Sequence, residues 1–130
     1  GVRLKSITDH KCVTTAKHRW LNQNPFGSMY FAVQSMASEL ATGVLMMREI
    51  QNSGRKISML VVGQKGEFHK KAKGKIVFDC LKDVKVQLAI DKTIKTGEGQ
   101  KLSLSCNGVD DSGAIVSEFE YNWSLKLKES

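Results

Sequence analysis

A single carboxylate lies in the most charge-poor stretch of this chain. Glu39 is the only residue charged at neutral pH among the 28 residues between Arg19 and Arg48. A quarter of the whole chain is charged, so about seven charges would be expected there at average composition. A helix so poor in charge is buried nearly all round, and we therefore expect Glu39 to be at least partly buried with it.

Burial without a neighbouring cation raises the pKa of a carboxylic acid, which suits such a group to accept a proton near neutrality. Glu39 is therefore the candidate general base of this chain. The structural alternative is an Arg or Lys that the fold brings to Glu39, giving a satisfied ion pair. The sequence alone supports these two hypotheses about equally, because structural ion pairs also perturb pKa values.

Small polar residues accompany this carboxylate. At about 100° per residue they fall within an arc of roughly 140°, which makes a polar stripe on an otherwise apolar helix. Such a stripe could line a cleft or form a wet contact between two helices of a dimer. It also makes the segment too polar for a transmembrane span. The stripe consists of Gln34, Ser35, Ser38, Glu39 and Thr42.

The thiols and imidazoles are scattered along the sequence. The cysteines are odd in number, lie far apart and form no CxxC, so we expect neither a disulfide framework nor a zinc site, but reduced thiols in a cytoplasmic protein. The histidines are equally dispersed, and the sequence predicts no metal. These residues are Cys12, Cys80 and Cys106, with His10, His18 and His69.

The net charge of +7 and the pI near 9.4 indicate a nucleic acid, an acidic membrane surface or a small polyanion as partner. The densest basic segment is 65–75, KGEFHKKAKGK. Each lysine there is typical of a solvated strand end, whereas the group could hold phosphates. A nucleic-acid domain would interleave more aromatics than the one present, Phe68, so we expect no nucleic-acid partner.

One long helix must position Glu39. From Met29 to about Gln51 there is no proline, and apolar residues recur at spacings of three and four. Ser28 can act as its N-cap, and Gly54 is available for a left-handed cap at its end.

Most of the remaining chain predicts strands. The last strand is the clearest, because apolar residues from Phe119 to Leu127 alternate with polar ones. Segment 83–96 fits either a strand or a helix face. A long apolar helix followed by antiparallel strands suggests an α+β fold in which one sheet wraps around that helix, in a single domain over 1–130. The other strands are expected near 2–7, 13–18, 57–62, 75–81 and 101–106.

Three motifs then resemble a known superfamily. Many hotdog-fold thioesterases carry His-Gly-Gly at the head of the helix, with Asp or Glu seven residues after the second glycine. Glu39 lies seven residues after Ala32, so Tyr30-Phe31-Ala32 stands in the His-Gly-Gly place. Segment 68–74 is similar to the aromatic-x-Lys-Pro-Ala-x-Gly strand segment, with Lys71 where proline is usual. Segment 24–29 resembles the Asn-rich, Gly-Ser/Thr-Met lead-in of a nearer branch.

Over essentially its whole length, the chain thus resembles PaaI-like hotdog thioesterases, and more closely the branch that includes the C-terminal domain of YiiD-type proteins. The resemblance implies hydrolysis of an acyl-CoA or acyl carrier protein thioester. Glu39 would activate water or attack the carbonyl, the N–H of Ala32 would polarise that carbonyl, and Asn24 would orient water or substrate. The implied substrate-binding residues are Tyr30, Phe31, Gln34, Ser38, Thr42, Lys70, Lys71 and Lys73.

The resemblance also implies a homodimer or larger homo-oligomer, and no cofactor beyond the coenzyme A of the substrate. The missing glycines at Phe31 and Ala32 motivate an alternative function, an acyl-thioester-binding module without chemistry. A nucleic-acid binder is the third hypothesis, motivated by the charge. The chain opens without methionine and runs almost directly into strand-like residues, so we expect an N-terminal segment, helical in type, ahead of Gly1.

Overall fold

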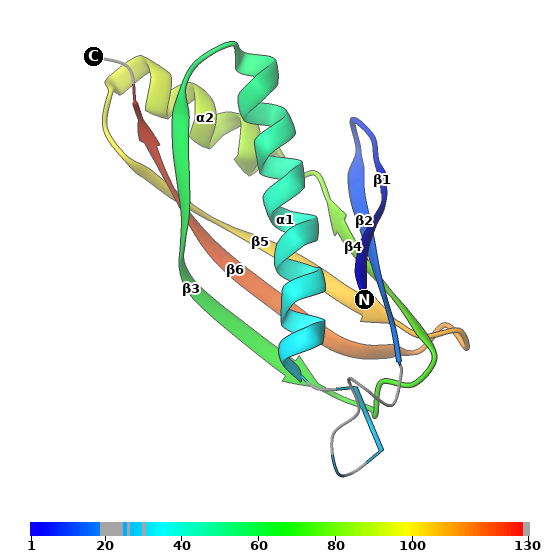
Figure 1. Ribbon diagram of the computed structural model, residues 1–130. Helices are drawn as coiled ribbons and strands as arrows, with labels where there is room; N and C mark the ends of the chain where they lie inside the picture. The colour runs from blue at the N-terminus through cyan, green and yellow to red at the C-terminus, as the bar shows by residue number, and fades with distance from the viewer. Residues whose placement is uncertain (19–24, 26, 30, 129–130) are drawn as a thin grey trace.

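A six-stranded antiparallel sheet carries both helices of the described part of the chain (Figure 1). The structure is a computed structural model and describes residues 1–18, 25, 27–29 and 31–128. The strand order is β1-β2-β4-β5-β6-β3, so β1 and β3 form the two edges. The elements are β1 (Val2–Ile7), β2 (Lys11–Lys17), α1 (Phe31–Ser53), β3 (Ile57–Phe68), β4 (Lys75–Leu81), α2 (Val84–Thr96), β5 (Gln100–Val109) and β6 (Ile115–Leu127).

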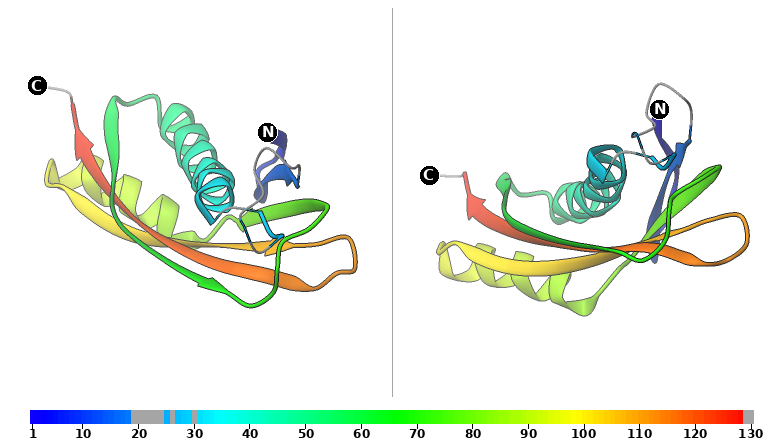
Figure 2. Two further views of the ribbon diagram at one scale, coloured as in Figure 1. Left: turned by 60° about the horizontal axis from the view of Figure 1, so that its bottom comes forward. Right: turned by 90° about the horizontal axis from the view of Figure 1, so that it is seen from below.

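Helix α1 lies along the concave face of the curved sheet, where it covers the main core (Figure 2). Its buried face meets apolar side chains that alternate along the strands, as the period of two in a half-buried strand requires. Burial of this apolar surface is the dominant favourable contribution to folding. The largest fully buried side chains include Tyr121, Phe78, Met46, Ile76 and Leu125.

The bounds of α1 agree with the sequence prediction to within two residues at each end. The helix spans Phe31–Ser53, against the predicted Met29 to Gln51. Gly54 has a φ of 70°, the left-handed conformation expected of a glycine that ends a helix. The N–H of Gly54 donates to the carbonyl of Gln51, which satisfies one carbonyl of the last turn.

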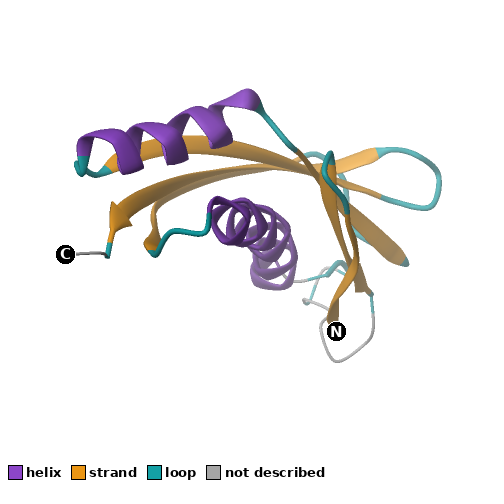
Figure 3. Ribbon diagram, turned by 90° about the horizontal axis from the view of Figure 1, so that it is seen from above, coloured by secondary structure: helices purple, strands orange, loops and turns teal. Residues whose placement is uncertain are grey.

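Helix α2 lies on the opposite face of the sheet from α1 (Figure 3). The segment whose pattern fitted both a strand and a helix is therefore a helix, and it buries Val86, Ile90 and Thr93. Its ends are capped: the carboxylate of Asp83 accepts from the N–H of Lys85, and Gly97 takes the left-handed conformation with a φ of 72°.

Strand β3 is longer than the sequence predicts. It covers Ile57–Phe68 rather than 57–62, so Lys65 lies within a strand. It pairs with β6 through an irregularity between Val61 and Gly63, and its other side has no partner strand among the described residues. A long free edge of this kind offers unpaired backbone groups to another strand.

Strand β6 confirms the alternation read from the sequence. Phe119, Tyr121, Trp123 and Leu125 are buried, whereas Glu118 and Glu120 are exposed on the other face. Within the described residues, the helices fall short of the length and apolar character that a membrane span would need.

Candidate active site

Glu39 lies on the flank of α1 that faces β6 and the β3 edge. Thr42 and Gly43, three and four residues further on, contact Trp123 of β6: the indole N–H of Trp123 donates to Thr42 Oγ1 over 3.1 Å, and a Cβ on Gly43 would lie 3.4 Å from the indole ring. The predicted burial of Glu39 is wrong for the single chain, in which the residue is exposed. The reason is geometric, because the sheet covers only part of the circumference of α1.

The charges of α1 separate into paired and unpaired groups. The buried carboxylate of Glu49 forms an ion pair with Lys82, whose Nζ lies 3.2 Å from Oε2. The guanidinium of Arg48 forms an ion pair with Asp9, with 2.7 Å between nitrogen and Oδ1. Glu39 forms no ion pair with any residue that the structure describes. The structural alternative raised for Glu39 thus applies instead to Glu49, which is the carboxylate of α1 that the fold buries against a cation.

Most of the polar stripe faces the sheet. Ser38 is buried and its hydroxyl lies 2.6 Å from the hydroxyl of Tyr121, which also donates to the carbonyl of Ser35 over 2.8 Å. Burial raises the pKa of the Tyr121 phenol, and the nearby Glu39 carboxylate adds to that rise, so the phenol remains a donor near neutrality. Sequence reasoning identified Tyr121 only as core, because its hydroxyl meets α1 through tertiary packing alone.

Gln34 is the member of the stripe whose hydrogen-bonding capacity is incomplete. Its side chain is 3% exposed and its Oε1 has no partner among the described residues. A buried acceptor without a donor is costly, at about 1–3 kcal/mol, so the site favours a ligand or water that donates a hydrogen bond to Oε1. Gln34 lies in the first turn of α1, one turn before Ser38 and Glu39.

Aromatic rings gather at the head of α1. Phe31 is 65% exposed, and its ring lies edge-on to Phe68 of β3 with centroids 6.3 Å apart. Phe68 in turn meets Phe119 at 5.5 Å. Ala32, the second residue of α1, is exposed and its N–H is one of the first four of the helix, which have no intrahelical acceptor. A partial positive charge at this end favours an oxyanion.

The basic loop between β3 and β4 is fastened to the residues that lead into α1. Ala72 is buried, its N–H donates to Ser28 Oγ, and its carbonyl accepts the N–H of Met29. Lys71 and Lys73 flank Ala72 and are exposed. The fold therefore brings two of the three predicted phosphate-binding lysines beside the start of α1.

The third lysine, Lys70, pairs with Asp110 at 2.9 Å. Hydrogen bonds from Ser112 and then from Lys70 hold the pKa of the Asp110 carboxyl below its ordinary value. Asn24 and Tyr30, predicted to orient the substrate and to line the site, lie outside the described residues.

Solved structures share this architecture at low sequence identity. A protein of unknown function from Pseudomonas aeruginosa, described as a probable thioesterase, matches with a TM-score of 0.85 and 22% identity over 97% of this chain and 83% of that chain. A Chlorobaculum tepidum protein of unknown function matches with a TM-score of 0.86 and 14% identity, over 98% of this chain and 83% of that chain. A Staphylococcus aureus thioesterase matches with a TM-score of 0.74 and 12% identity, over 96% of this chain and 93% of that chain.

These similarities confirm the predicted hotdog fold at the level of a six-stranded antiparallel sheet with two helices. No curated protein matches the chain. At the level of sequence, residues 1–125 match a family described as a domain of unknown function, DUF4442, and the chain belongs to this family.

Proposed function

We propose that this protein hydrolyses acyl thioesters, of coenzyme A or of acyl carrier protein, with Glu39 as the catalytic carboxylate. The observation that supports this most directly is that Glu39, the one charge in the first half of α1, is unpaired among the described residues and lies on a helix face near the N-terminal end. The thioesterase descriptions of similar structures support the reaction class.

Spacing within the chain supports a role for Asn24 beside Glu39. The Staphylococcus aureus thioesterase has been solved with a glutamate replaced by alanine, and also with a glutamine fifteen residues earlier replaced by alanine. Asn24 precedes Glu39 by the same fifteen residues. Both side chains are carboxamides, so Asn24 could orient the water or the thioester as a glutamine would.

In the proposed reaction, the carboxylate of Glu39 takes a proton from water, and the resulting hydroxide attacks the thioester carbonyl. Alternatively, the carboxylate attacks the carbonyl itself, and water then hydrolyses the mixed anhydride. The N–H of Ala32 stabilises the oxyanion at the helix terminus. In the first route the carbon–sulfur bond then breaks, and the proton held by Glu39 passes to the departing sulfur. In the second route that bond breaks as the mixed anhydride forms, and the later attack of water supplies the proton for the sulfur. The products of both routes are a free acid and a thiol. Lys71 and Lys73 would hold the phosphates of the carrier.

We propose further that the active form is a homodimer. Within the described part of the chain, one edge of the 12-residue strand β3 is free, and apolar side chains are exposed both on β3 and on the outward face of α1. Antiparallel pairing of β3 with β3 of a second copy would satisfy the edge and bring the partner over the flank that carries Glu39. Glu39 would then lie in a cleft between two chains. The exposed apolar residues are Phe31, Met36, Leu40, Met47, Leu60, Val62 and Phe68.

The substitution Glu39→Gln tests the catalytic role, with release of free thiol from acyl-CoA esters of several chain lengths as the readout. Loss of a general base costs about 10²- to 10⁴-fold in rate, so we expect kcat to fall by at least a hundredfold. The matched control is Glu98→Gln, at an exposed glutamate between α2 and β5. Equal turnover by wild type and Glu39→Gln would reject Glu39 as the catalytic group.

A non-catalytic acyl-thioester-binding module is the second candidate function. It is favoured by the exposed ring of Phe31, which occupies the place of a glycine at the head of α1 and limits close approach of a thioester to the backbone. Saturable binding of acyl-CoA without release of thiol, in wild type and in Phe31→Gly, would support this candidate over hydrolysis.

The resemblance to the YiiD-like branch depends on segment 24–29, part of which lies outside the described residues, and it stays a prediction. The three cysteines are free and buried, which supports our proposal of a reducing compartment, the cytoplasm.

A further inference from the structure

Three side chains with metal-binding atoms meet on the face of the sheet opposite Glu39. Glu67 lies on β3, His69 follows that strand by one residue, and Glu118 lies on β6. One ligand atom from each lies within 4.8 Å of the other two. His69 Nε2 is 2.9 Å from Glu118 Oε2. In sequence these histidine and glutamate residues are 49 positions apart, so only the pairing of β3 with β6 brings them together.

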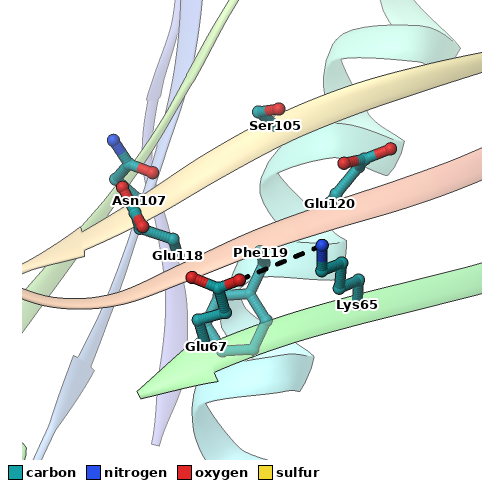
Figure 4. Close-up of a pocket in the computed structure, with 7 residues that line it drawn as sticks. All are labelled: Lys65, Glu67, Ser105, Asn107, Glu118, Phe119 and Glu120. Atoms are coloured by element: carbon teal, nitrogen blue, oxygen red, sulfur yellow. Dashed lines mark ion pairs between the residues drawn. The ribbon is translucent and has the colours of Figure 1, made fainter. Parts of the chain in front are cut away.

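Backbone register fixes this arrangement. Glu67 and Glu118 are direct partners across the β3–β6 ladder, so their side chains leave the sheet on the same face (Figure 4). The N–H of His69 donates to the carbonyl of Val116 over 2.9 Å, which continues the pairing beyond the last residue of β3. The period of two then places His69 on the same face as Glu67. Two of the three side chains are thus held by strands, and the third is tied to β6 by a backbone hydrogen bond.

The electrostatics of this cluster favour a cation. Like charges directly opposite each other on neighbouring strands are destabilising. Glu120 adds a third carboxylate to the same cavity of about 300 Å³. Among the described residues Lys65 is the one lysine that lines it, with its Nζ 3.9 Å from Glu67 Oε1 (Figure 4). With His69 neutral, these groups have a net formal charge of −2 in a chain whose overall charge is +7.

The donor set selects the class of ion. Mg²⁺ and Ca²⁺ prefer six or more oxygen ligands, whereas an imidazole nitrogen suits Zn²⁺, Ni²⁺, Cu²⁺ and iron. Three protein ligands with an open cavity leave a coordination position for water. We propose that Glu67, His69 and Glu118 bind one divalent transition-metal ion, with Zn²⁺ as the probe. This differs from the prediction of no metal, which depended on the scattering of the histidines along the sequence.

Isothermal titration calorimetry of the tag-free full chain with ZnCl₂ tests the site. We expect one saturable site per chain, and an affinity that falls in both His69→Gln and Glu118→Gln. The decrease should be at least the roughly 10- to 100-fold that loss of an outer-shell partner costs a metal site. Matched controls are His10→Gln and Glu98→Gln, at exposed residues elsewhere, which should bind as wild type does.

Thermal unfolding provides a second readout. Zn²⁺ should raise the Tm of wild type and of both controls, but not that of His69→Gln, because a ligand stabilises only the state that binds it. MgCl₂ at the same concentration should have no such effect. Absence of saturable Zn²⁺ binding, or equal binding by His69→Gln and wild type, would overturn the proposal. The site is on the other face from Glu39, so it does not rest on the proposed function.

Discussion

Charged side chains on α1 differ according to what the sheet places beside them. Glu49 is 6% exposed and forms an ion pair with Lys82, so removal of Lys82 would leave a buried carboxylate uncompensated. Glu39 has no such partner among the described residues and is exposed in the single chain. The same residue type is therefore structural at one position of the helix and available for chemistry ten residues earlier.

Asp110 shows what a well-satisfied carboxylate contributes. It accepts hydrogen bonds from the side chain and N–H of Ser112, from the N–H of Ala114 and from Lys70. These hydrogen bonds lower the pKa of the Asp110 carboxyl in the folded protein, and the one from the Ser112 side chain contributes most. A depressed folded pKa gives stability that is present above the unfolded pKa of about 3.9 and is lost as the pH falls through the folded value.

We therefore predict that Asp110→Asn lowers the Tm by a few degrees at pH 7, and that the gap between variant and wild type narrows as the pH falls below about 4. Thermal unfolding followed by circular dichroism, from about pH 7 down to about pH 2, measures this difference in Tm. Asp111→Asn, at the exposed neighbour, is the control. A gap that stays constant across the acid range would contradict the linkage.

At the scale of elements, α2 illustrates how local and tertiary signals combine. Its apolar residues alternate as in a strand and also fit one helix face, so periodicity alone could not decide between the two. Asp83 and Gly97 supply an N-cap and a left-handed C-cap, and both are local signals. The outer face of the sheet then buries Val86, Ile90 and Thr93 together, which only a helix can do.

The cap at Asp83 gives a prediction for this element. Asp83→Ala removes the acceptor of the Lys85 N–H and should lower the free energy of unfolding by about 1 kcal/mol. Asp83→Ser keeps an acceptor at the cap, so its decrease in the free energy of unfolding should be less than about half that of Asp83→Ala. Urea denaturation of the three proteins measures the difference. If alanine and serine lowered the stability equally, the cap hydrogen bond would not be the cause.

At the scale of the whole molecule, α1 leaves one side of the concave face uncovered. It packs beside the β1–β2 hairpin, whereas β3 forms the far edge with its apolar residues exposed (Figure 1). Exposed apolar surface and an unpaired strand edge on the same side of a small domain are typical of an interface between copies. The proposed active site would then be completed only on association.

This surface leads to a prediction about assembly. Wild type should behave in sedimentation velocity as a multiple of the 14.4 kDa chain. Met36→Lys places an ammonium group in the proposed interface and should weaken association at least about tenfold, since an unpaired buried charge is costly. Leu88→Lys is the matched control, because Leu88 is 60% exposed, against 58% for Met36, and lies on α2 across the sheet. Monomeric wild type, or equal weakening by both variants, would reject this interface.

Much of the fold could be predicted from the sequence, because the signals are local. The period of three to four residues gave the helix of Glu39 to within two residues at each end, and the alternation from Phe119 to Leu127 identified β6 and its buried face. The resemblance around Ala32 and Glu39 likewise predicts the hotdog fold.

Tertiary structure decided what depends on contacts between distant residues. Periodicity states that a helix face is apolar or polar, but not how much of the helix the sheet will cover, and so Glu39 was expected to be buried and is exposed. Strand pairing set the length of β3 and brought His69 to Glu118, and the packing of α1 on the sheet brought Ser38 to the Tyr121 hydroxyl. The sequence by itself determined the elements and singled out the carboxylate, whereas its exposure and the Glu67–His69–Glu118 cluster follow from packing across many positions of the chain.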